Sequence, residues 1–135
     1  MNNRKAFTIV EMLIVVMLIA LLAVLMVPKF IGQLDVAQEK LVKPKMATLA
    51  QALTLYKGLT GNYPTQAQGL KALIDPPADV ADKWKNDDIK KDDLLDPWNN
   101  PFEYVIPGQT NTHSFDLISY GPDGKKGGGD DFVND

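Results

Sequence analysis

The stretch FTIVEMLIVVMLIALLAVLMV, from Phe7 to Val27, constrains this chain most, because it is almost wholly apolar and carries a single formal charge, Glu11. About 20 apolar residues are enough for a helix to cross a bilayer. Arg4 and Lys5 precede the run and acidic residues predominate after it, which favours a cytoplasmic N-terminus and an exported C-terminal part. We therefore predict one membrane-spanning helix.

Two alternatives compete for this run. A cleaved secretory signal has a shorter apolar region, and here PKFIGQLDV follows the run without a small-x-small cleavage site. A plain membrane anchor fits the length but leaves Glu11 without a role. Because a carboxylate in a membrane segment is costly, it is usually paired. We expect no partner for Glu11 within the run itself.

Helical periodicity continues beyond the run. The apolar residues of one face recur at alternating spacings of four and three, as in an amphipathic helix: Val42, Met46, Leu49, Leu53 and Tyr56. Gly58 is the expected stop signal. We predict one long helix over about 8–57 that Pro28 and Pro44 kink or loosen; Pro44 could instead separate two helices.

The remainder predicts a small α+β head. Thr65 and Gln68 form a T-x-x-Q capping box, so a short helix should begin near Gln66, bury Leu70, Leu73 and Ile74, and end at Pro76-Pro77.

The charged stretch after this helix, 78–95, should be an exposed loop. PFEYVI and HSFDLISY are typical of two antiparallel strands, and the Gly- and Asp-rich tail should be irregular.

Composition excludes several function classes. The 135 residues carry a net charge of −3, and without Arg4, Lys5 and Glu11 the 14 basic and 17 acidic residues become 12 and 16. This acidic balance argues against a nucleic-acid surface. Cysteine is absent and His113 is the single histidine, so thiolate or histidine sites are not expected.

Two weaker interpretations concern enzymes and sugars. Asp116 and Asp123 could be proposed as an acid–base pair, but no nucleophile or oxyanion hole accompanies them, so we predict no enzyme. Trp84 or Trp98 could bind a sugar in a membrane-anchored binding module, although packing is the more frequent use of such side chains.

The tail holds the strongest metal signal. Asp123, Asp130 and Asp131 alternate with glycines, and carboxylates plus backbone carbonyls are the ligands that calcium prefers. The spacing is neither that of an EF-hand nor that of a repeated nonapeptide. From composition alone, a calcium loop and a mobile acidic tail remain equal alternatives.

The stretch RKAFTIVEMLIVV resembles the N-terminal signature of type IV prepilins. The resemblance implies that a prepilin peptidase cuts between Ala6 and Phe7 on the cytoplasmic side and methylates the new N-terminus, although the family usually has Gly where this chain has Ala6. Thr8 and Glu11 then occupy the second and fifth mature positions, and Pro28 matches a helix-loosening proline of the family.

This resemblance gives Glu11 a partner. Cleavage creates a free α-amino group at Phe7, which Glu11 of an adjacent subunit can neutralise. An assembly in the wrong register leaves both charges unpaired, so the pair makes assembly register-specific.

Three further blocks, NYPTQAQGLKALI, DPWNNPFEY and SYGPDGKKGGGDDF, resemble those of the major pseudopilins of type II secretion systems, the general secretion pathway protein G family. The resemblance implies a type IV pilin-like α+β fold with a leader over 1–6, a transmembrane and assembly helix over 7–27, and a periplasmic head over 28–135. It also implies a calcium site. Its side-chain ligands would be Asp123, Asp130 and Asp131, and its backbone carbonyls would come from Tyr120, Lys125 and Gly128.

The same resemblance implies a non-catalytic subunit of a helical filament in the inner membrane, with its head in the periplasm. Its expected partners are further copies of the chain, the prepilin peptidase, minor pseudopilins and the inner-membrane assembly platform, with no nucleic acid. A type IV pilus or competence pseudopilin subunit is the alternative.

Overall fold

The computed structural model of the chain describes residues 7–134, and for residues 27–33 it describes the backbone alone. The elements are helix α1 (Ile9–Thr60), the 3₁₀ helices η1 (Leu70–Leu73) and η2 (Lys91–Leu94), and strands β1 (Glu103–Val105), β2 (Asp116–Ser119) and β3 (Phe132–Val133). The chain divides between Val36 and Ala37 into two compact units, which are described separately.

The first unit contains the apolar beginning of α1. Residues Ile9–Met26 have a mean hydropathy of 3.1, and none of their side chains is buried. Among the described residues this is the one segment long and apolar enough to cross a membrane. Its length and exposure agree with the predicted membrane helix.

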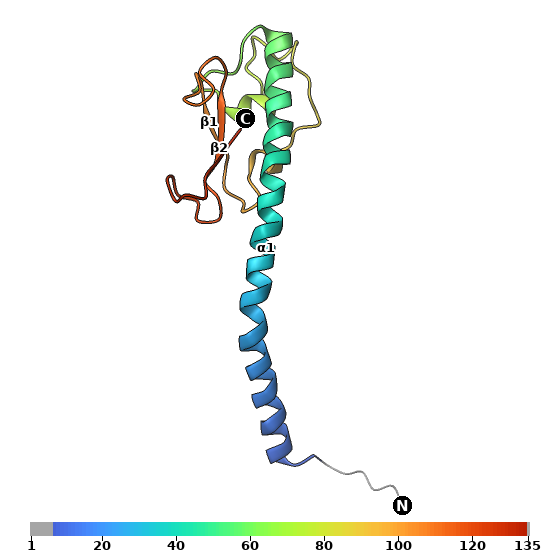
Figure 1. The fold of residues 1–135 in the computed structure, drawn as a ribbon. Coiled ribbons are helices and arrows are strands. Elements are labelled where there is room, and N and C mark those ends of the chain that lie inside the picture. Colours follow the sequence, from blue (N-terminus) through green and yellow to red (C-terminus); the bar gives the residue numbers. More distant parts are fainter. Residues whose placement is uncertain (1–6, 135) are drawn as a thin grey trace, which may run out of the picture. The chain divides into compact units, whose positions relative to one another are not determined.

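The second unit is built around the remainder of α1. The predicted helix face is confirmed, since Val42, Met46, Leu49, Leu53 and Tyr56 are each at most 3% exposed. They form one hydrophobic core with side chains from the head, among them Tyr104, Phe115 and Leu117. Figure 1 shows the green part of α1 running beside β1 and β2.

Helix α1 continues through Pro44, so the alternative of two helices divided there is wrong. The hydroxyl of Thr48 donates a hydrogen bond to the Pro44 carbonyl at 3.1 Å. Pro28 also lies inside α1. The helix ends at Thr60, next to Gly61, two residues beyond the stop signal expected at Gly58.

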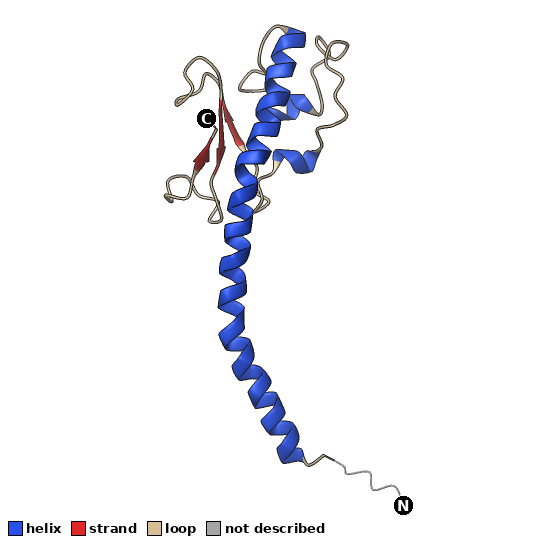
Figure 2. Ribbon diagram, turned by 45° about the vertical axis from the view of Figure 1, so that its right-hand side comes forward, coloured by secondary structure: helices blue, strands red, loops and turns tan. Residues whose placement is uncertain are grey.

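The sheet has the order β1-β2-β3 and is antiparallel throughout (Figure 2). Glu103 pairs with Ile118 between β1 and β2, which confirms the two predicted strands. The tail is not wholly irregular as predicted, because Phe132 pairs with Ser119 and forms a third strand. The Asn134 side chain extends this pairing by accepting a hydrogen bond from the Leu117 N–H at 2.6 Å.

The segment after α1 departs from the predicted helix. The capping box forms, with the Thr65 N–H donating to Gln68 Oε1 at 2.8 Å and the Gln68 N–H donating to Thr65 Oγ1 at 3.3 Å. A turn follows instead of an α-helix, because Gly69 has a φ of 57°. Only the short η1 forms, and it buries Leu70 and Leu73.

The charged stretch is more ordered than an exposed loop. Trp84 and Ile89 are 2% and 7% exposed and belong to the core, and η2 follows them. The Lys45 ammonium donates to the Leu95 carbonyl at 2.8 Å, which ties this stretch to α1. Val80 and Leu94 also pack against the core, so apolar residues spaced among the charges hold this stretch against the head.

Candidate functional site

Glu11 and Thr8 bond reciprocally at the start of α1. The Thr8 N–H donates to Glu11 Oε2 at 2.9 Å, and the Glu11 N–H donates to Thr8 Oγ1 at 3.2 Å. The Thr8 hydroxyl also donates to Glu11 Oε2 at 3.2 Å. This T-x-x-E arrangement is a capping box, which satisfies N–H groups that have no partner within the helix.

The expectation that Glu11 has no partner within the apolar run is therefore wrong. The T-x-x-E pattern at Thr8 and Glu11 is the same local signal as the T-x-x-Q pattern at Thr65 and Gln68. Phe7 lies beside Thr8 in the described chain, whereas Ala6 lies outside the described residues. A carboxylate has room for more than these bonds, so the cap leaves Glu11 able to meet a cation as well.

The second candidate site is the tail loop, which we define as residues 120–131. Asp123 Oδ1 accepts a hydrogen bond from the Lys125 N–H at 2.8 Å, and Asp131 Oδ2 accepts one from the Gly127 N–H at 2.8 Å. These two bonds fold the loop back on itself, so that its carboxylates lie near its own backbone.

Gly128 allows two of these carboxylates to approach each other. A β-carbon at Gly128 would collide with Asp130 Oδ1 and would lie 2.8 Å from Asp123 Oδ2. Both oxygens therefore occupy the side of Gly128 that a larger residue would fill. Only glycine fits at this position.

Asp130 Oδ1 and one further oxygen of the loop, Asp131 Oδ1, are buried yet accept no hydrogen bond. A buried, unpaired carboxylate oxygen is costly, and a bound cation is one common reason for it. Within residues 7–134, however, no three His, Cys, Asp or Glu side chains gather closely enough to hold a metal by themselves. The loop thus offers converging anionic oxygens without a complete side-chain cage.

The other predicted ligands lie in the same loop. Tyr120 directly follows β2, and Lys125 and Gly128 lie in the exposed part between Asp123 and Asp130. Only their backbone carbonyls would face an ion, and calcium accepts carbonyl ligands alongside carboxylates. The donor set fits calcium better than magnesium, which requires a stricter octahedral shell.

Comparison with known proteins identifies the family. The model of the prokaryotic N-terminal methylation motif matches residues 1–27, and that of type II secretion system protein G matches residues 29–134. The chain belongs to the type II secretion system protein G family.

Individual relatives agree with this assignment. The type II secretion system core protein G of Pseudomonas aeruginosa is 37% identical over 96% of this chain and 91% of its own length. That of Escherichia coli K12 is 33% identical over 98% of this chain and 92% of its own length.

A solved structure supports the fold. It is the crystal structure of the major pseudopilin from the type 2 secretion system of enterohaemorrhagic Escherichia coli, with a TM-score of 0.59 and 32% identity over 77% of this chain and 91% of that chain. The predicted pilin-like α+β fold is thereby confirmed. A member of this family is a structural subunit of the pseudopilus of type II secretion.

Neither tryptophan of this family member is arranged as a sugar platform. Trp84 donates its indole N–H to the Leu73 carbonyl at 3.0 Å and packs on Tyr56, with 5.1 Å between ring centroids. Trp98 stacks on Phe132, with 6.2 Å between the ring centroids and an angle of 22° between the ring planes. Both rings therefore pack within the head, as expected for the more frequent role of such side chains.

The Asp116 carboxylate is hydrogen-bonded to the loop that precedes it and is not available as an acid–base partner of Asp123. Its carboxylate accepts hydrogen bonds from the N–H groups of Gln109, Thr110 and Asn111 at 2.6–2.9 Å, and from the Asn111 side chain. Burial acts to raise the pKa of Asp116, but these bonds outweigh it, so the pKa is lowered from 3.8.

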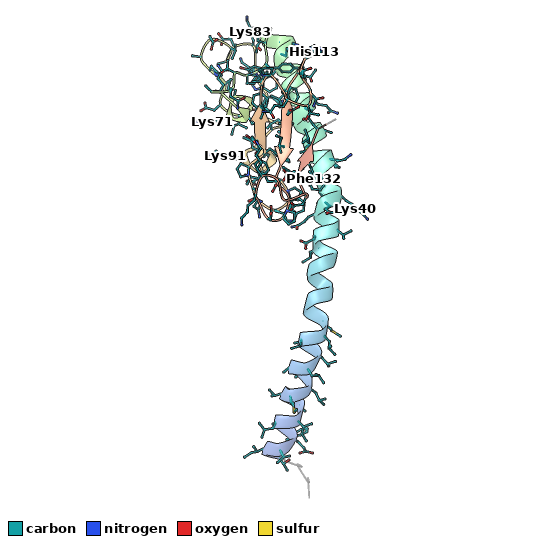
Figure 3. The ribbon with its side chains drawn as sticks, turned by 60° about the vertical axis from the view of Figure 1, so that its left-hand side comes forward. Lys40, Lys71, Lys83, Lys91, His113 and Phe132 are labelled. Carbon is teal, nitrogen blue, oxygen red and sulfur yellow. The ribbon has the colours of Figure 1, made fainter. Side chains whose placement is uncertain are left out.

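This loop lies at the opposite end of the sheet from the tail loop. Figure 3 labels His113 and Phe132 toward opposite ends of the strands. His113 is exposed in the loop that joins β1 to β2. Asp116 therefore serves the loop around His113, and the carboxylates of the tail form a separate group.

Sequence reasoning missed the polar residues that support the tail loop. Asp96 is 1% exposed, and its Oδ1 accepts hydrogen bonds from the N–H groups of Trp98 and Asn100 at 3.0 and 2.8 Å. The D-P-W-N-N pattern is typical of an aspartate that bonds the backbone of a following turn, and this signal could have identified it.

The arrangement at Asp116 generates a pH-dependent prediction. Asp116→Asn should lower the free energy of unfolding at pH 7 by about 1–3 kcal/mol, because an amide group then faces several N–H donors. Since the folded pKa is lowered, the native carboxylate contributes stability above its unfolded pKa and loses it as the pH falls through the folded pKa. Denaturant unfolding can be monitored by tryptophan fluorescence. The difference in free energy of unfolding between the wild type and Asp116→Asn should become smaller below about pH 4.

Asp79→Asn is the matched control, because Asp79 is exposed. It should leave stability almost unchanged at either pH. If the loss of unfolding free energy in Asp116→Asn stays constant from neutral to strongly acidic pH, the role given to these hydrogen bonds is contradicted.

Proposed function

We propose that this chain is cut between Ala6 and Phe7, methylated on Phe7, and assembled into a helical pseudopilus whose growth drives folded proteins across the outer membrane. The observation that carries this proposal is the wholly exposed apolar segment Ile9–Met26, which belongs to the same helix that forms the core of the head. Such a segment needs lipid before assembly and needs other helices afterwards.

The location and partners follow from the same segment. The chain resides in the inner membrane with its N-terminus in the cytoplasm and its head in the periplasm, because basic residues precede the apolar run. The chain interacts with the prepilin peptidase, the assembly platform, minor pseudopilins and other copies of itself. The role we propose is structural rather than catalytic, and the engagement of Asp116 by its own loop supports this.

Glu11 sets the register of assembly. Cleavage turns Phe7 into a cationic N-terminus, and Glu11 of a neighbouring subunit neutralises it. Once both groups are buried among helices, loss of one partner costs about 3–5 kcal/mol, because the other charge remains unpaired. The bonds from Thr8 hold the Glu11 carboxylate at the helix start, where a neighbour's amine can reach it.

Two substitutions separate the charge of Glu11 from its capping role. Glu11→Gln keeps an acceptor for the Thr8 N–H, since a capping box tolerates Gln, but it removes the charge. It should leave membrane insertion intact and abolish or sharply reduce filaments and secretion. Thr8→Ala keeps the charge and loses the hydroxyl, and should retain most filaments.

Filament yield in sheared-cell fractions and secreted-protein assays measure both effects. Normal filaments from Glu11→Gln, or their loss from Thr8→Ala alone, would show that the cap rather than the charge governs assembly.

Calcium is the cofactor proposed for the tail loop. The proposal is supported by three oxygens: Asp123 Oδ2 and Asp130 Oδ1 converge on Gly128, and Asp130 Oδ1 and Asp131 Oδ1 are buried without a hydrogen bond. Asp123 completes the carboxylate set, and the carbonyls of Tyr120, Lys125 and Gly128 would add neutral oxygens. Bound calcium supplies the positive charge that these carboxylates lack. The loop would then hold its fold without the disulfides that this cysteine-free chain cannot form.

The calcium proposal predicts a thermal shift. Ligand binding to the folded state alone stabilises it by about 2.7 kcal/mol at a hundredfold excess over Kd. The head of the full-length chain in detergent should therefore melt at least about 10 °C higher in millimolar calcium than in chelator. Fluorescence of Trp84 and Trp98, both in the head, reports this melting.

Asp123→Ala, Asp130→Ala and Asp131→Ala should each remove most of the shift, and magnesium should replace calcium poorly. Asp79→Ala, an exposed aspartate outside the loop, should keep the full shift. An unchanged melting curve of the unsubstituted chain in calcium would refute the metal assignment and leave the pseudopilus assignment untouched.

A further inference from the structure

The segment Asp96–Asn100, which we name the DPWNN loop, has a tightly fixed backbone. Asp96 Oδ1 accepts hydrogen bonds from the N–H groups of Trp98 and Asn100, and the Asp96 N–H donates to the Asn100 carbonyl at 2.7 Å. Asn99 takes a φ of 66°, which closes the turn. These bonds hold the side chains of Trp98 and Asn100 in defined directions.

The Asn100 side chain faces residues 121–124, the first part of the tail loop. Its Nδ2 donates to the Gly121 carbonyl at 3.4 Å, and a β-carbon at Gly124 would lie 3.3 Å from both Nδ2 and Oδ1 of Asn100. The Gly124 N–H donates to the Gly121 carbonyl at 3.3 Å, which closes a turn around Asp123. Asn100 thus holds the turn that carries one of the calcium-binding carboxylates.

Ser119 connects Asp96 to the same part of the tail loop. Its hydroxyl donates to Asp96 Oδ2 at 2.7 Å, and its oxygen accepts a hydrogen bond from the Gly121 N–H at 3.3 Å. Gly121 in turn touches Asp130, because a β-carbon at Gly121 would lie 2.6 Å from the Asp130 carbonyl and from its Oδ2. The position of Asp130 therefore depends on Gly121, and Gly121 is fixed by Ser119 and Asn100.

Trp98 contacts the chain directly after the tail loop. Its ring stacks on Phe132, the residue directly after Asp131, with 6.2 Å between centroids. Phe132 is labelled beside this loop in Figure 3. The DPWNN loop thus contacts the chain before Asp123 and after Asp131, the two ends of the carboxylate set.

We propose that Asn100, together with the Asp96–Ser119 pair, positions the calcium-binding carboxylates without touching the ion. This inference rests on the calcium binding proposed above. Outer groups that orient metal ligands commonly change metal affinity when they are replaced, although they form no bond to the metal. Asn100 places the Asp123 turn, and Ser119 places Gly121 and hence Asp130.

The decisive experiment is calorimetric titration of calcium chloride into the full-length chain in detergent. Asn100→Ala should raise the calcium Kd about tenfold or more. Ser119→Ala is a second variant and should raise it as well. Melting of each variant in chelator separates this effect from a general loss of stability, since a merely structural role would lower the melting temperature and leave the Kd unchanged.

Gln66→Ala is the matched control. The Gln66 amide donates to the Tyr104 carbonyl at 2.6 Å and accepts from the Ile106 N–H at 2.9 Å, at the other end of β1. Loss of the Gln66 amide should lower the melting temperature in chelator and leave the calcium Kd at the wild-type value.

The outcomes distinguish the two proposals. A wild-type Kd for Asn100→Ala, or an equal rise for Gln66→Ala, would overturn the positioning role while calcium binding stands. Absence of calcium binding by the unsubstituted chain would overturn both.

Discussion

The contact on which the head depends is the burial of one face of α1 against a very small sheet. The strands β1, β2 and β3 contain only a few residues each, and a sheet of this size is marginal without a packing partner. The helix provides that partner, because Leu49 and Leu53 are completely buried and share one core with Leu117. The same helix carries the apolar Ile9–Met26 segment, so one element serves both the head and assembly.

Features set by local sequence could be predicted. The alternation of fours and threes from Val42 to Tyr56 identified the buried face of α1, and the aromatic and branched residues around Tyr104 and Leu117 identified β1 and β2. Features that depend on contacts between residues distant in the sequence could not be predicted from it. β3 exists because Phe132 and Val133 pair with β2 and Asn134 adds side-chain bonds to it, and nothing in FVND alone indicates a strand.

The candidate sites divide in the same way. The carboxylates of the tail loop were visible as spacing, because glycines and aspartates alternate within a short stretch. The residues that hold this loop in place were not visible in the sequence pattern. The hydrogen bonds from Asn100 to Gly121 and from Ser119 to Asp96 join residues more than twenty positions apart. The capping box of Thr8 and Glu11 was local and could have been found from its pattern. It gives the Glu11 carboxylate a role at the start of the helix, besides the pairing with a neighbouring subunit proposed above.

The proposed assembly requires that the apolar beginning of α1 becomes the N-terminus of the mature subunit. Mass spectrometry of the chain purified from membranes of cells with an active prepilin peptidase tests it most directly. We expect a mature chain that begins at Phe7 and carries one N-methyl group. A chain that retains Met1 in those cells, with no methylated Phe7 species, would contradict it.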